Sequence, residues 1–477
     1  MKAKFLRKKY PKFIYKDYSY KISKKSLEIF FDFKIEPNFI FKPKLVIENI
    51  NKSRIKKIKK EVLNNLVFHL GLIELLSYWK ATCSPKIEIR KHSLNKKQIK
   101  WWKDLIINGM GQFFYENKIN WQSSNFIDII SKSAETRSLP IFPGRLKNRV
   151  LAPVGGGKDS IVTLEILKKT KFPIRCFSLN TTNSAKKVMK VAGCKKAIIV
   201  KRTIDPKLME LNRQGFLNGH TPFSAYLAFL SVLLAVTFDQ KYIAFSNERS
   251  SNEGNLIYLG KQINHQYSKS FNFEKRFRKY SKEYLAKYVE YFSFLRPLHE
   301  IQIAKLFSRY PKYFNSFLSC NEAYKTKSGT KKPIGKWCGK CPKCLFIFTC
   351  LYAFINKEKL IKIFGQNLFK KKGLLSLMKE LIGIEKFKPF ECVGTKNESL
   401  IAFYLSWKKA NRVGEEPVLL KYFKNKILPL KIRKGFVRGL SRYPKLEKES
   451  KEIMTSWNKK HNLPKDFVKI LKKFRDS

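Results

Sequence analysis

The feature that most constrains this chain is a run of three glycines followed by Lys-Asp-Ser, at residues 155–160. The run follows a short apolar segment, RVLAPV, and precedes IVTLEILKK, whose apolar residues recur at helical spacing. Glycines let backbone amides approach an anion closely, and the first turn of a helix adds unpaired N–H groups and a positive dipole end. The sequence therefore predicts a phosphate-binding turn between a strand and a helix.

The side chains of this turn add to the prediction. Asp159 is a carboxylate beside phosphates, which is repulsive unless it holds Mg²⁺, a cation that prefers oxygen ligands. The spacing fits neither G-x-x-x-x-G-K-[ST] nor G-x-G-x-x-G. A tight turn that merely uses glycine is the alternative, and three successive glycines at the end of a strand disfavour it. The residues expected to bind ATP phosphates are Gly155, Gly156, Gly157, Lys158 and Ser160.

From Val150 onward, strand-like and helix-like segments alternate along the chain. This alternation predicts a parallel sheet with right-handed crossovers. The longest apolar run, from Phe223 to Phe238, is shorter than the roughly 18–20 residues of a membrane span and is expected to be a buried helix. The predicted strands are 149–154, 174–180, 196–202 and 241–247, and the predicted helices between them include 161–169 and 184–193.

The predicted fold class is α/β, with three regions. Residues 1–145 are expected to form a mixed domain, with strands at 13–20 and 27–35 and helices at 61–79 and 98–117. A loop rich in proline and glycine, at 139–148, marks its end. Residues 146–365 are expected to form the nucleotide-binding domain, and 366–477 a basic helical region.

Four cysteines have the spacing of metal ligands: Cys320, Cys338, Cys341 and Cys344 form C-x17-C-x2-C-x2-C. Four thiolates complete a closed tetrahedral Zn²⁺ site, which predicts a structural metal. Redox thiols and an iron–sulfur cluster are the alternatives. Cys350 is expected to lie in the core. The chain has nine cysteines and no secretory signal, so its thiols are expected to be reduced and the protein cytoplasmic.

The charge balance indicates an anionic ligand. The chain has 99 Lys and Arg against 36 Asp and Glu, a formal charge of +63, and a field of that size attracts nucleic acid, membrane surfaces or phosphorylated metabolites. Biased base composition explains the excess equally well, because the lysines are spread along the whole chain.

Three polar stretches lie where strands end or helices begin, at residues 218–222, 246–254 and 264–270. Loops that hold acids, histidines and amides after parallel strands are candidate ligand sites. Taken singly, each of these residues is better explained as solvated loop polarity, whereas the three stretches together favour a functional site. His69, His92 and His461 lack such surroundings and are expected to be structural or exposed.

The glycine turn resembles the S-G-G-x-D-S signature of PP-loop ATP pyrophosphatases, with Gly155 where that family usually has Ser. Longer segments are similar to UDP-N-acetylmuramoyl-L-alanyl-L-glutamate epimerases. The segments that carry this resemblance are HLGLIELLSYWKA, GMGQFFYENKI, GHTPFSAY, SNERSSNEGN, NHQYSKSFNFE, FSFLRPLHE, WCGKCPKCLFIF and PFECVGTKNES. The resemblance extends over roughly residues 60–405 and is weak at both ends of the chain.

This resemblance implies a PP-loop domain of the adenine nucleotide alpha hydrolase type and an enzyme of peptidoglycan precursor synthesis. Such an enzyme inverts the terminal L-Glu of UDP-N-acetylmuramoyl-L-Ala-L-Glu to D-Glu, consumes ATP and releases AMP and pyrophosphate. The implied cofactors are ATP, Mg²⁺ held by Asp159, and structural Zn²⁺. The implied partner is the UDP-muramoyl dipeptide. The chain itself is expected to have no membrane span.

The resemblance also implies roles for individual residues. The acid–base group at the α-carbon needs a pKa near the working pH. Its candidates are His220, His265 and Glu248, beside Lys158 and Asp159 at the phosphates. The residues expected to bind substrate are Arg249, Asn264, Tyr267 and Lys269, of which Arg249 and Lys269 suit a carboxylate or diphosphate.

Two other functions compete with the epimerase. A PP-loop enzyme that adenylates a base in tRNA would suit the positive charge, since RNA binding depends on phosphate contacts. No separate RNA-binding module is recognised in the sequence, which disfavours nucleic acid as a partner. A nucleotide-sensing protein without catalysis is the third candidate, and the complete Lys-Asp-Ser turn argues against it.

Overall fold

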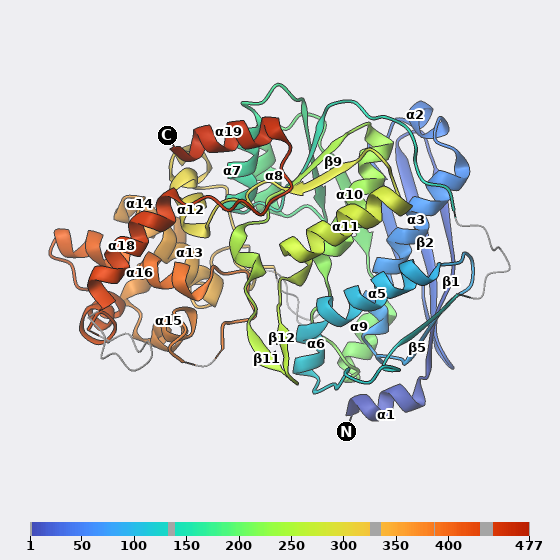
Figure 1. Cartoon of the computed structure of the whole chain (residues 1–477), viewed down its shortest axis with the longest axis horizontal. Helices are drawn as coiled ribbons and strands as arrows, with labels where there is room; N and C mark the ends of the chain where they lie inside the picture. The colour runs from blue at the N-terminus through green and yellow to red at the C-terminus, as the bar shows by residue number, and fades with distance from the viewer. Residues whose placement is uncertain (1, 132–138, 325–334, 386, 430–441, 477) are drawn as a thin grey trace.

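A long mixed sheet forms the framework of the molecule, and the C-terminal helices gather beside it (Figure 1). The computed structural model describes residues 2–131, 139–324, 335–385, 387–429 and 442–476. Within these residues the main sheet has 11 strands in the order β13-β10-β7-β8-β9-β4-β2-β1-β5-β6, with β3 paired to β2. The neighbours from β13 to β9 are all parallel. A separate hairpin joins β11 (Leu256–Tyr258) to β12 (Lys261–Ile263).

The sheet separates two apolar cores, because successive residues of a strand point to opposite faces. In β7 (Val150–Pro153), Val150 and Ala152 lie in one core and Leu151 lies in the other. In β10 (Tyr242–Phe245), Ile243 likewise faces away from Ala244. Strands buried on both faces read as continuous apolar runs, which is why these short segments were recognisable in the sequence.

The parallel half confirms the strands and helices predicted after Val150. The glycine turn connects β7 to a helix that begins at Lys158, and the apolar run Phe223–Phe238 forms one buried helix. The elements of this half are α7 (Lys158–Leu167), β8 (Ile174–Leu179), α8 (Asn183–Val191), β9 (Ile198–Thr203), α9 (Pro206–Arg213), α10 (Phe223–Phe238), α11 (Phe271–Tyr284), β13 (Glu290–Ser293) and α12 (Glu300–Ser308).

The N-terminal segment continues the same sheet, which the sequence did not predict. Strand β4 (Lys44–Glu48) pairs antiparallel with β9, and Ile47 lies opposite Val200. The division into regions at residues 145 and 365 stays a prediction. The elements of this segment are α1 (Lys2–Lys9), β1 (Lys12–Ile22), β2 (Ser26–Ile35), β3 (Phe39–Phe41), α2 (Lys52–Lys56), α3 (Lys60–Glu74), α4 (Leu76–Trp79), β5 (Lys86–Ile89), α5 (Lys96–Gly109), α6 (Gly111–Glu116) and β6 (Asp128–Ser131).

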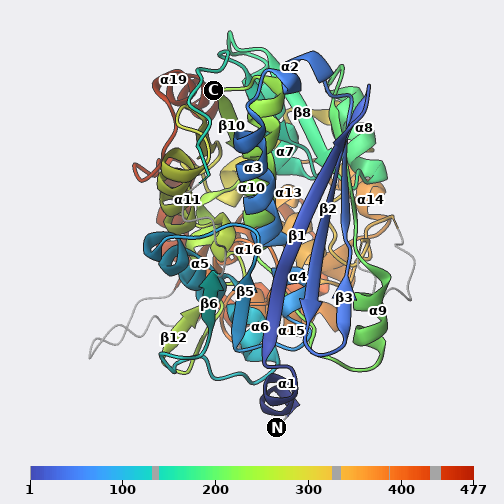
Figure 2. The same ribbon diagram turned by 90° about the vertical axis from the view of Figure 1, so that its right-hand side faces the viewer.

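Helices α3 and α10 lie side by side on one face of the sheet (Figure 2). Helix α10 is buried along nearly its whole length and ends at Asp239, which adopts the left-handed conformation of a helix cap. Within the described residues, no helix combines the length and the apolar character that crossing a bilayer requires.

The helices after residue 340 pack on the other face of the sheet and on one another. The last helix returns to the nucleotide half, where Phe467 packs against Phe172 and Tyr242, with ring centroids 5.2 and 5.1 Å away. These helices are α13 (Pro342–Tyr352), α14 (Lys357–Phe364), α15 (Leu375–Leu381), α16 (Lys396–Arg412), α17 (Val418–Tyr422), α18 (Arg442–Thr455) and α19 (Lys465–Asp476). Residues 430–441 of the predicted helical region lie outside the described residues.

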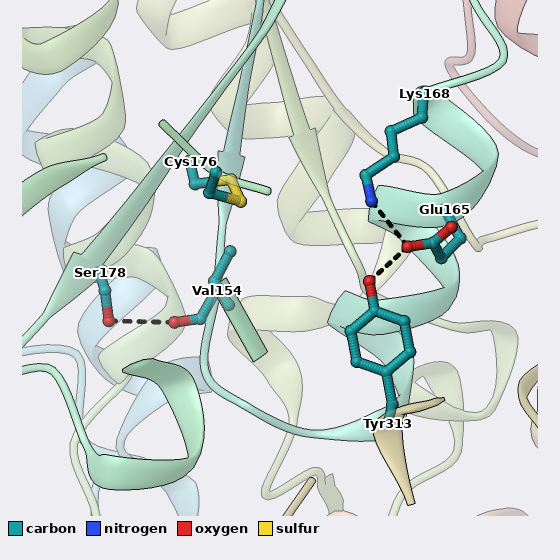
Figure 3. The surroundings of a disulfide bond; sticks show 7 residues. Val154, Glu165, Lys168, Cys176, Ser178 and Tyr313 are labelled. Atoms are coloured by element: carbon teal, nitrogen blue, oxygen red, sulfur yellow. Dashed lines mark hydrogen bonds and ion pairs between the residues drawn. A yellow bond between two sulfur atoms is a disulfide. The ribbon is translucent and has the colours of Figure 1, made fainter. Parts of the chain in front are cut away.

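One pair of cysteines contradicts the expectation of reduced thiols. Cys176 of β8 and Cys194, just after α8, form a disulfide with Cα atoms 6.1 Å apart (Figure 3). The strand and the end of its crossover helix are adjacent in the fold, so residues 18 apart in sequence come into bonding distance. Nearby, Ser178 Oγ donates a hydrogen bond of 3.0 Å to the Val154 carbonyl and so links β8 to the end of β7.

The junction between β4 and β9 gives a test of the continuous sheet. Ile47 is fully buried there, so Ile47→Ala is expected to lower the free energy of unfolding by about 2–5 kcal/mol through lost burial and a residual cavity. Denaturant unfolding measures the change. Ile257→Ala is the control, because Ile257 is 75% exposed and should change stability by less than about 0.5 kcal/mol. Equal effects of the two variants would contradict the packing described.

Candidate functional site

The glycine turn has little room for side chains at its second position. Gly156 has φ +89°, and a Cβ there would lie 2.3 Å from Ser184 Oγ and 2.7 Å from the Ala185 amide nitrogen. The Leu318 amide donates a hydrogen bond of 2.9 Å to the Gly156 carbonyl. At Gly155, in contrast, a Cβ would meet nothing within 4 Å. The turn is therefore fixed at Gly156 and open at Gly155, where a serine would fit.

A hollow of about 110 Å³ adjoins Gly155. It lies at the carboxyl ends of the parallel strands β7 and β8, where open α/β sheets bind their ligands. The side chains of Thr182 and Phe223 also line it, which brings the first turns of α8 and α10 to the same place. The hollow is the space beside the predicted phosphate-binding turn.

Lys158, the first residue of α7, is fully buried between two carboxylates. Its ammonium group contacts Asp159 and Glu300, the first residue of α12. Burial lowers the pKa of Lys158, but the two carboxylates raise it by more, so the lysine stays charged. Burial raises the pKa of Glu300 to about 7, even though Lys158 acts in the opposite direction. Lys158 thus joins α7 to α12 and is not directed at solvent.

The Asp159 carboxylate is about a quarter exposed and faces three ammonium groups. Burial raises the pKa of Asp159, but Lys158, Lys343 and Lys269 lower it by more, so the group is ionised at neutral pH. An exposed carboxylate at a helix N-terminus next to a glycine turn can bind a hard cation.

Glu398 holds the beginnings of two helices together. Its carboxylate accepts hydrogen bonds from the Glu300 amide at 2.7 Å and from the Thr395 amide, the cap of α16, at 2.7 Å. The His299 ring lies 3.0 Å from the same carboxylate. Burial raises the pKa of Glu398, but the hydrogen bonds from His299 and the two amides lower it to about 2.

A second charged group lies close to the glycine turn. The Lys269 ammonium donates a hydrogen bond of 3.2 Å to Cys392 Sγ and interacts electrostatically with Glu248 and Asp159. The loop that carries Lys269 is held by the fully buried Arg296, which donates to the Lys269 and Glu248 carbonyls and forms an ion pair of 3.5 Å with Glu274. Two of the predicted stretches, 246–254 and 264–270, therefore meet around one guanidinium.

The two histidines predicted as acid–base candidates lie together. The ring centroids of His220 and His265 are 4.5 Å apart, and His265 Nδ1 contacts Gln112 of α6. Burial, followed by the charges of His265, Lys80 and Lys269, holds the pKa of His220 well below its usual value. Lys80 Nζ in turn donates to the Gly219 carbonyl at 3.1 Å and fixes the His220 loop.

Other predicted site residues contact neighbouring elements. Arg249 donates to Ser456 Oγ at 3.3 Å, and Tyr267 donates to Asp104 of α5 at 3.2 Å. Asn264 braces its own loop by donating to the Ser251 carbonyl at 2.9 Å. Ser160 donates to the Gly157 carbonyl at 2.9 Å. Of these four, Asn264 is linked to the Lys269 loop through Ser251, whose hydroxyl donates to the Lys269 carbonyl at 3.1 Å.

The four cysteines converge as their spacing predicts. All four Sγ atoms lie within 4.8 Å of one another, with Cys320–Cys341 at 3.8 Å and Cys338–Cys344 at 3.7 Å. Sulfurs bound tetrahedrally to one metal at about 2.3 Å are separated by about 3.8 Å, so the set can hold one ion. Residues 325–334, between Cys320 and Cys338, lie outside the described residues.

No sequence pattern had indicated a role for Glu300, Arg296, Lys343, Cys392 or Glu398. All five lie in segments quoted for the family resemblance: FSFLRPLHE, WCGKCPKCLFIF and PFECVGTKNES. No strand was predicted directly before Glu300, which begins α12. No local pattern indicated that Glu398, 98 residues later, would cap the same helix.

Glu398 gives a pH-dependent test. Because its folded pKa is lowered from 4.5 to about 2, its ionisation stabilises the fold above pH ~4.5, and this contribution is lost as pH falls towards 2. Glu398→Gln should lower the free energy of unfolding at pH 7 by about 2–3 kcal/mol. Denaturant unfolding between pH ~7 and ~2 should show the difference from the parent shrinking on acidification. Glu452→Gln, whose side chain is 62% exposed, is the control and should have little effect.

Comparison with known proteins places these residues in one family. The MurL N-terminal domain matches residues 4–294, and the MurL C-terminal domain matches residues 316–429. No solved structure matches the chain significantly.

Three curated relatives carry the name UDP-N-acetyl-alpha-D-muramoyl-L-alanyl-L-glutamate epimerase. The protein of Xanthomonas oryzae pv. oryzae is 32% identical over 360 residues, which cover 76% of this chain and 78% of the relative. The protein of Salinispora tropica is 40% identical over 257 residues, 54% of this chain and 55% of the relative. The protein of Micromonospora sp. is 32% identical over 340 residues, which cover 70% of this chain and 73% of the relative. With both domains matched in order, the chain belongs to the MurL epimerase family.

Proposed function

We propose that this chain catalyses the ATP-dependent epimerisation of the terminal L-Glu of UDP-N-acetylmuramoyl-L-Ala-L-Glu to D-Glu, in peptidoglycan precursor synthesis. The observation that carries the proposal is the family match, since residues 4–294 and 316–429 include the glycine turn, the histidine pair, Lys269 and the four cysteines. The position of the glycine turn at the carboxyl end of β7 supports a PP-loop type of nucleotide site.

The chemistry explains why ATP is consumed. The hydrogen on a carbon beside an ionised carboxylate is weakly acidic, because its removal adds a second negative charge to the same group. Transfer of AMP to the carboxylate removes that charge and releases pyrophosphate. The α-proton can then leave to a planar enolate and return on the other face. Hydrolysis of the acyl-adenylate drives the reaction forward.

The glycine turn is the proposed pyrophosphate site. Backbone amides of Gly155–Gly157 and the N-terminus of α7 supply donors to an anion. Asp159 is the proposed Mg²⁺ ligand, since its carboxylate is partly exposed at this terminus. Direct contact of Lys158 with phosphate would require its buried ion pairs to open, so we assign to Lys158 the role of holding Asp159 and Glu300.

The dipeptide end of the substrate is proposed to lie towards Lys269 and the histidine pair. The Lys269 ammonium suits a carboxylate, and His220, whose pKa is held well below its usual value, is an uncharged base near it. Substrate contacts of Arg249, Asn264 and Tyr267 and an acid–base role for Glu248 stay predictions. A UDP-linked substrate and ATP favour the cytoplasm as the compartment of this protein.

Pyrophosphate release gives a direct test. With ATP, Mg²⁺ and UDP-N-acetylmuramoyl-L-Ala-L-Glu, the protein should release pyrophosphate, and chiral analysis of hydrolysed product should find D-Glu. Asp159→Ala should lower kcat by about 100-fold or more, because the metal at the phosphates is lost. Asp466→Ala, at an exposed acid of α19, is the matched control and should keep the parent rate.

The outcomes separate the competing functions. Release of pyrophosphate with tRNA and none with the dipeptide would replace the epimerase by a base-modifying enzyme. ATP binding without pyrophosphate release under either substrate would indicate a nucleotide-sensing protein.

We propose further that the four cysteines hold one structural Zn²⁺. The set of four thiolates with no open position is typical of structural zinc. Metal analysis of the purified protein should find one zinc per chain. Cys344→Ser should lose the zinc and lower the melting temperature, since metal binding contributes folding free energy. Cys350→Ala, at a buried cysteine outside the cluster, should keep the zinc. Visible absorbance of an iron–sulfur cluster would contradict the assignment.

A further inference from the structure

Cys392 is the one cysteine that the site, the cluster and the core leave without a role. Of the nine cysteines in the chain, Cys392 alone is both partly exposed and bonded to a lysine. The others are the four of the metal cluster, the disulfide pair Cys176 and Cys194, and the fully buried Cys83 and Cys350.

The loop that carries Cys392 is fixed from three sides. Asn255 Nδ2 donates to the Pro389 carbonyl at 2.8 Å, and the Lys343 ammonium contacts the Cys392 carbonyl. At Gly394, a Cβ would lie 2.5 Å from the Phe346 ring of α13, so the backbone packs tightly against that helix. A thiol held this firmly has a defined direction, which is a requirement for stereospecific proton transfer.

The thiol is paired with a buried ammonium group. Burial lowers the pKa of Lys269, but Cys392 and Glu248 raise it by more, so the lysine remains charged. A lysine ammonium beside a cysteine is the arrangement that favours the thiolate, which is the form able to accept a proton. The hydrogen bond of 3.2 Å from Lys269 Nζ to Cys392 Sγ has this geometry.

Two lysines connect Cys392 with the phosphate-binding turn. Lys269 contacts the thiol and Lys343 contacts the carbonyl of Cys392, and both interact electrostatically with Asp159. A carboxylate activated next to Asp159 would therefore have its α-carbon near the same pair of lysines. His265 approaches this loop as well, with its ring centroid 6.3 Å from that of Phe390.

We propose that Cys392 is a catalytic acid–base residue of the epimerisation, paired with Lys269, an inference that rests on the proposed function above. The Cys392 thiolate takes the α-proton of the activated glutamyl residue. The electron pair of the broken C–H bond passes into the enolate, and the sulfur becomes a thiol. An imidazolium of the His220–His265 pair adds a proton to the opposite face and becomes neutral. Exchange with water returns both groups to their starting states.

The thiol also supplies the second acid–base group that inversion requires in addition to the histidines. Inversion requires groups on both faces of a planar intermediate, whereas His220 and His265 have ring centroids only 4.5 Å apart and occupy one region. Glu248 is buried, and Ser250 Oγ approaches its carboxylate at 3.3 Å. Cys392 lies on a separate segment, the loop before α16, and the proposal assigns its thiol to the face of the intermediate opposite to the histidine pair.

The test separates adenylation from proton transfer. Cys392→Ser should keep ATP- and dipeptide-dependent pyrophosphate release within about threefold, because Asp159 and the glycine turn are untouched. Formation of D-Glu should fall by about 100-fold or more, the usual contribution of an acid–base group. Cys194→Ser, outside the site, is the matched cysteine control and should keep both activities. Melting temperatures establish that both variants are folded.

A second measurement does not depend on activity. Iodoacetamide should alkylate Cys392, located by mass spectrometry, and Lys269→Met should slow this alkylation by about tenfold because the thiolate loses its ammonium partner. An unchanged alkylation rate would overturn the pairing, and full D-Glu formation by Cys392→Ser would overturn the catalytic role. If the unaltered protein releases no pyrophosphate and forms no D-Glu, the proposed function itself fails, which is a different result.

Discussion

The buried ammonium of Lys158 is the interaction on which the candidate site depends. It lies between Asp159 and Glu300 and is fully excluded from water. Removal of one partner from such a buried set leaves an uncompensated charge, which typically costs about 3–5 kcal/mol. Because Glu300 begins α12 and Glu398 caps both α12 and α16, this one charge orients three helices around the glycine turn. The turn owes its position to these helices as much as to its own glycines.

The distribution of charge makes this arrangement unusual within the chain. Acids are outnumbered 36 to 99 overall, yet eight glutamates are buried among the described residues, against four buried lysines and arginines. Acidic residues are therefore over-represented among the buried charged residues, where they bind ammonium, guanidinium or amide donors. The excess of positive charge is a property of the surface. It does not by itself identify a ligand, and the site is better recognised by its buried carboxylates.

Local patterns were sufficient for much of the fold. The strand at Val150, the helix at Lys158 and the buried helix Phe223–Phe238 follow from apolar periodicity and glycine position, and Cys-x2-Cys spacing predicted the cluster. Pairing of β4 with β9 could not be predicted, because it joins residues over 150 positions apart with no local signal. The same limit applies to Cys392 and to the contacts of Glu398 with His299 and Glu300, which lie 99 and 98 positions away, whereas its contact with Thr395 is local. The Cys176–Cys194 disulfide was missed because general cytoplasmic chemistry was applied to a pair that the fold makes adjacent.

The packing of α19 has a consequence for how the protein is made. Phe467 completes an aromatic cluster with Phe172, Tyr242 and Phe292 on the nucleotide half of the sheet. During translation those three rings leave the ribosome long before Phe467. Until α19 is synthesised, this apolar face of the nascent sheet is therefore exposed to solvent. That interval is when association with other nascent chains, or binding by a chaperone, competes with folding. Ribosomes that stop before residue 465 would release chains with the glycine turn present and its supporting core open, which quality-control proteases can recognise.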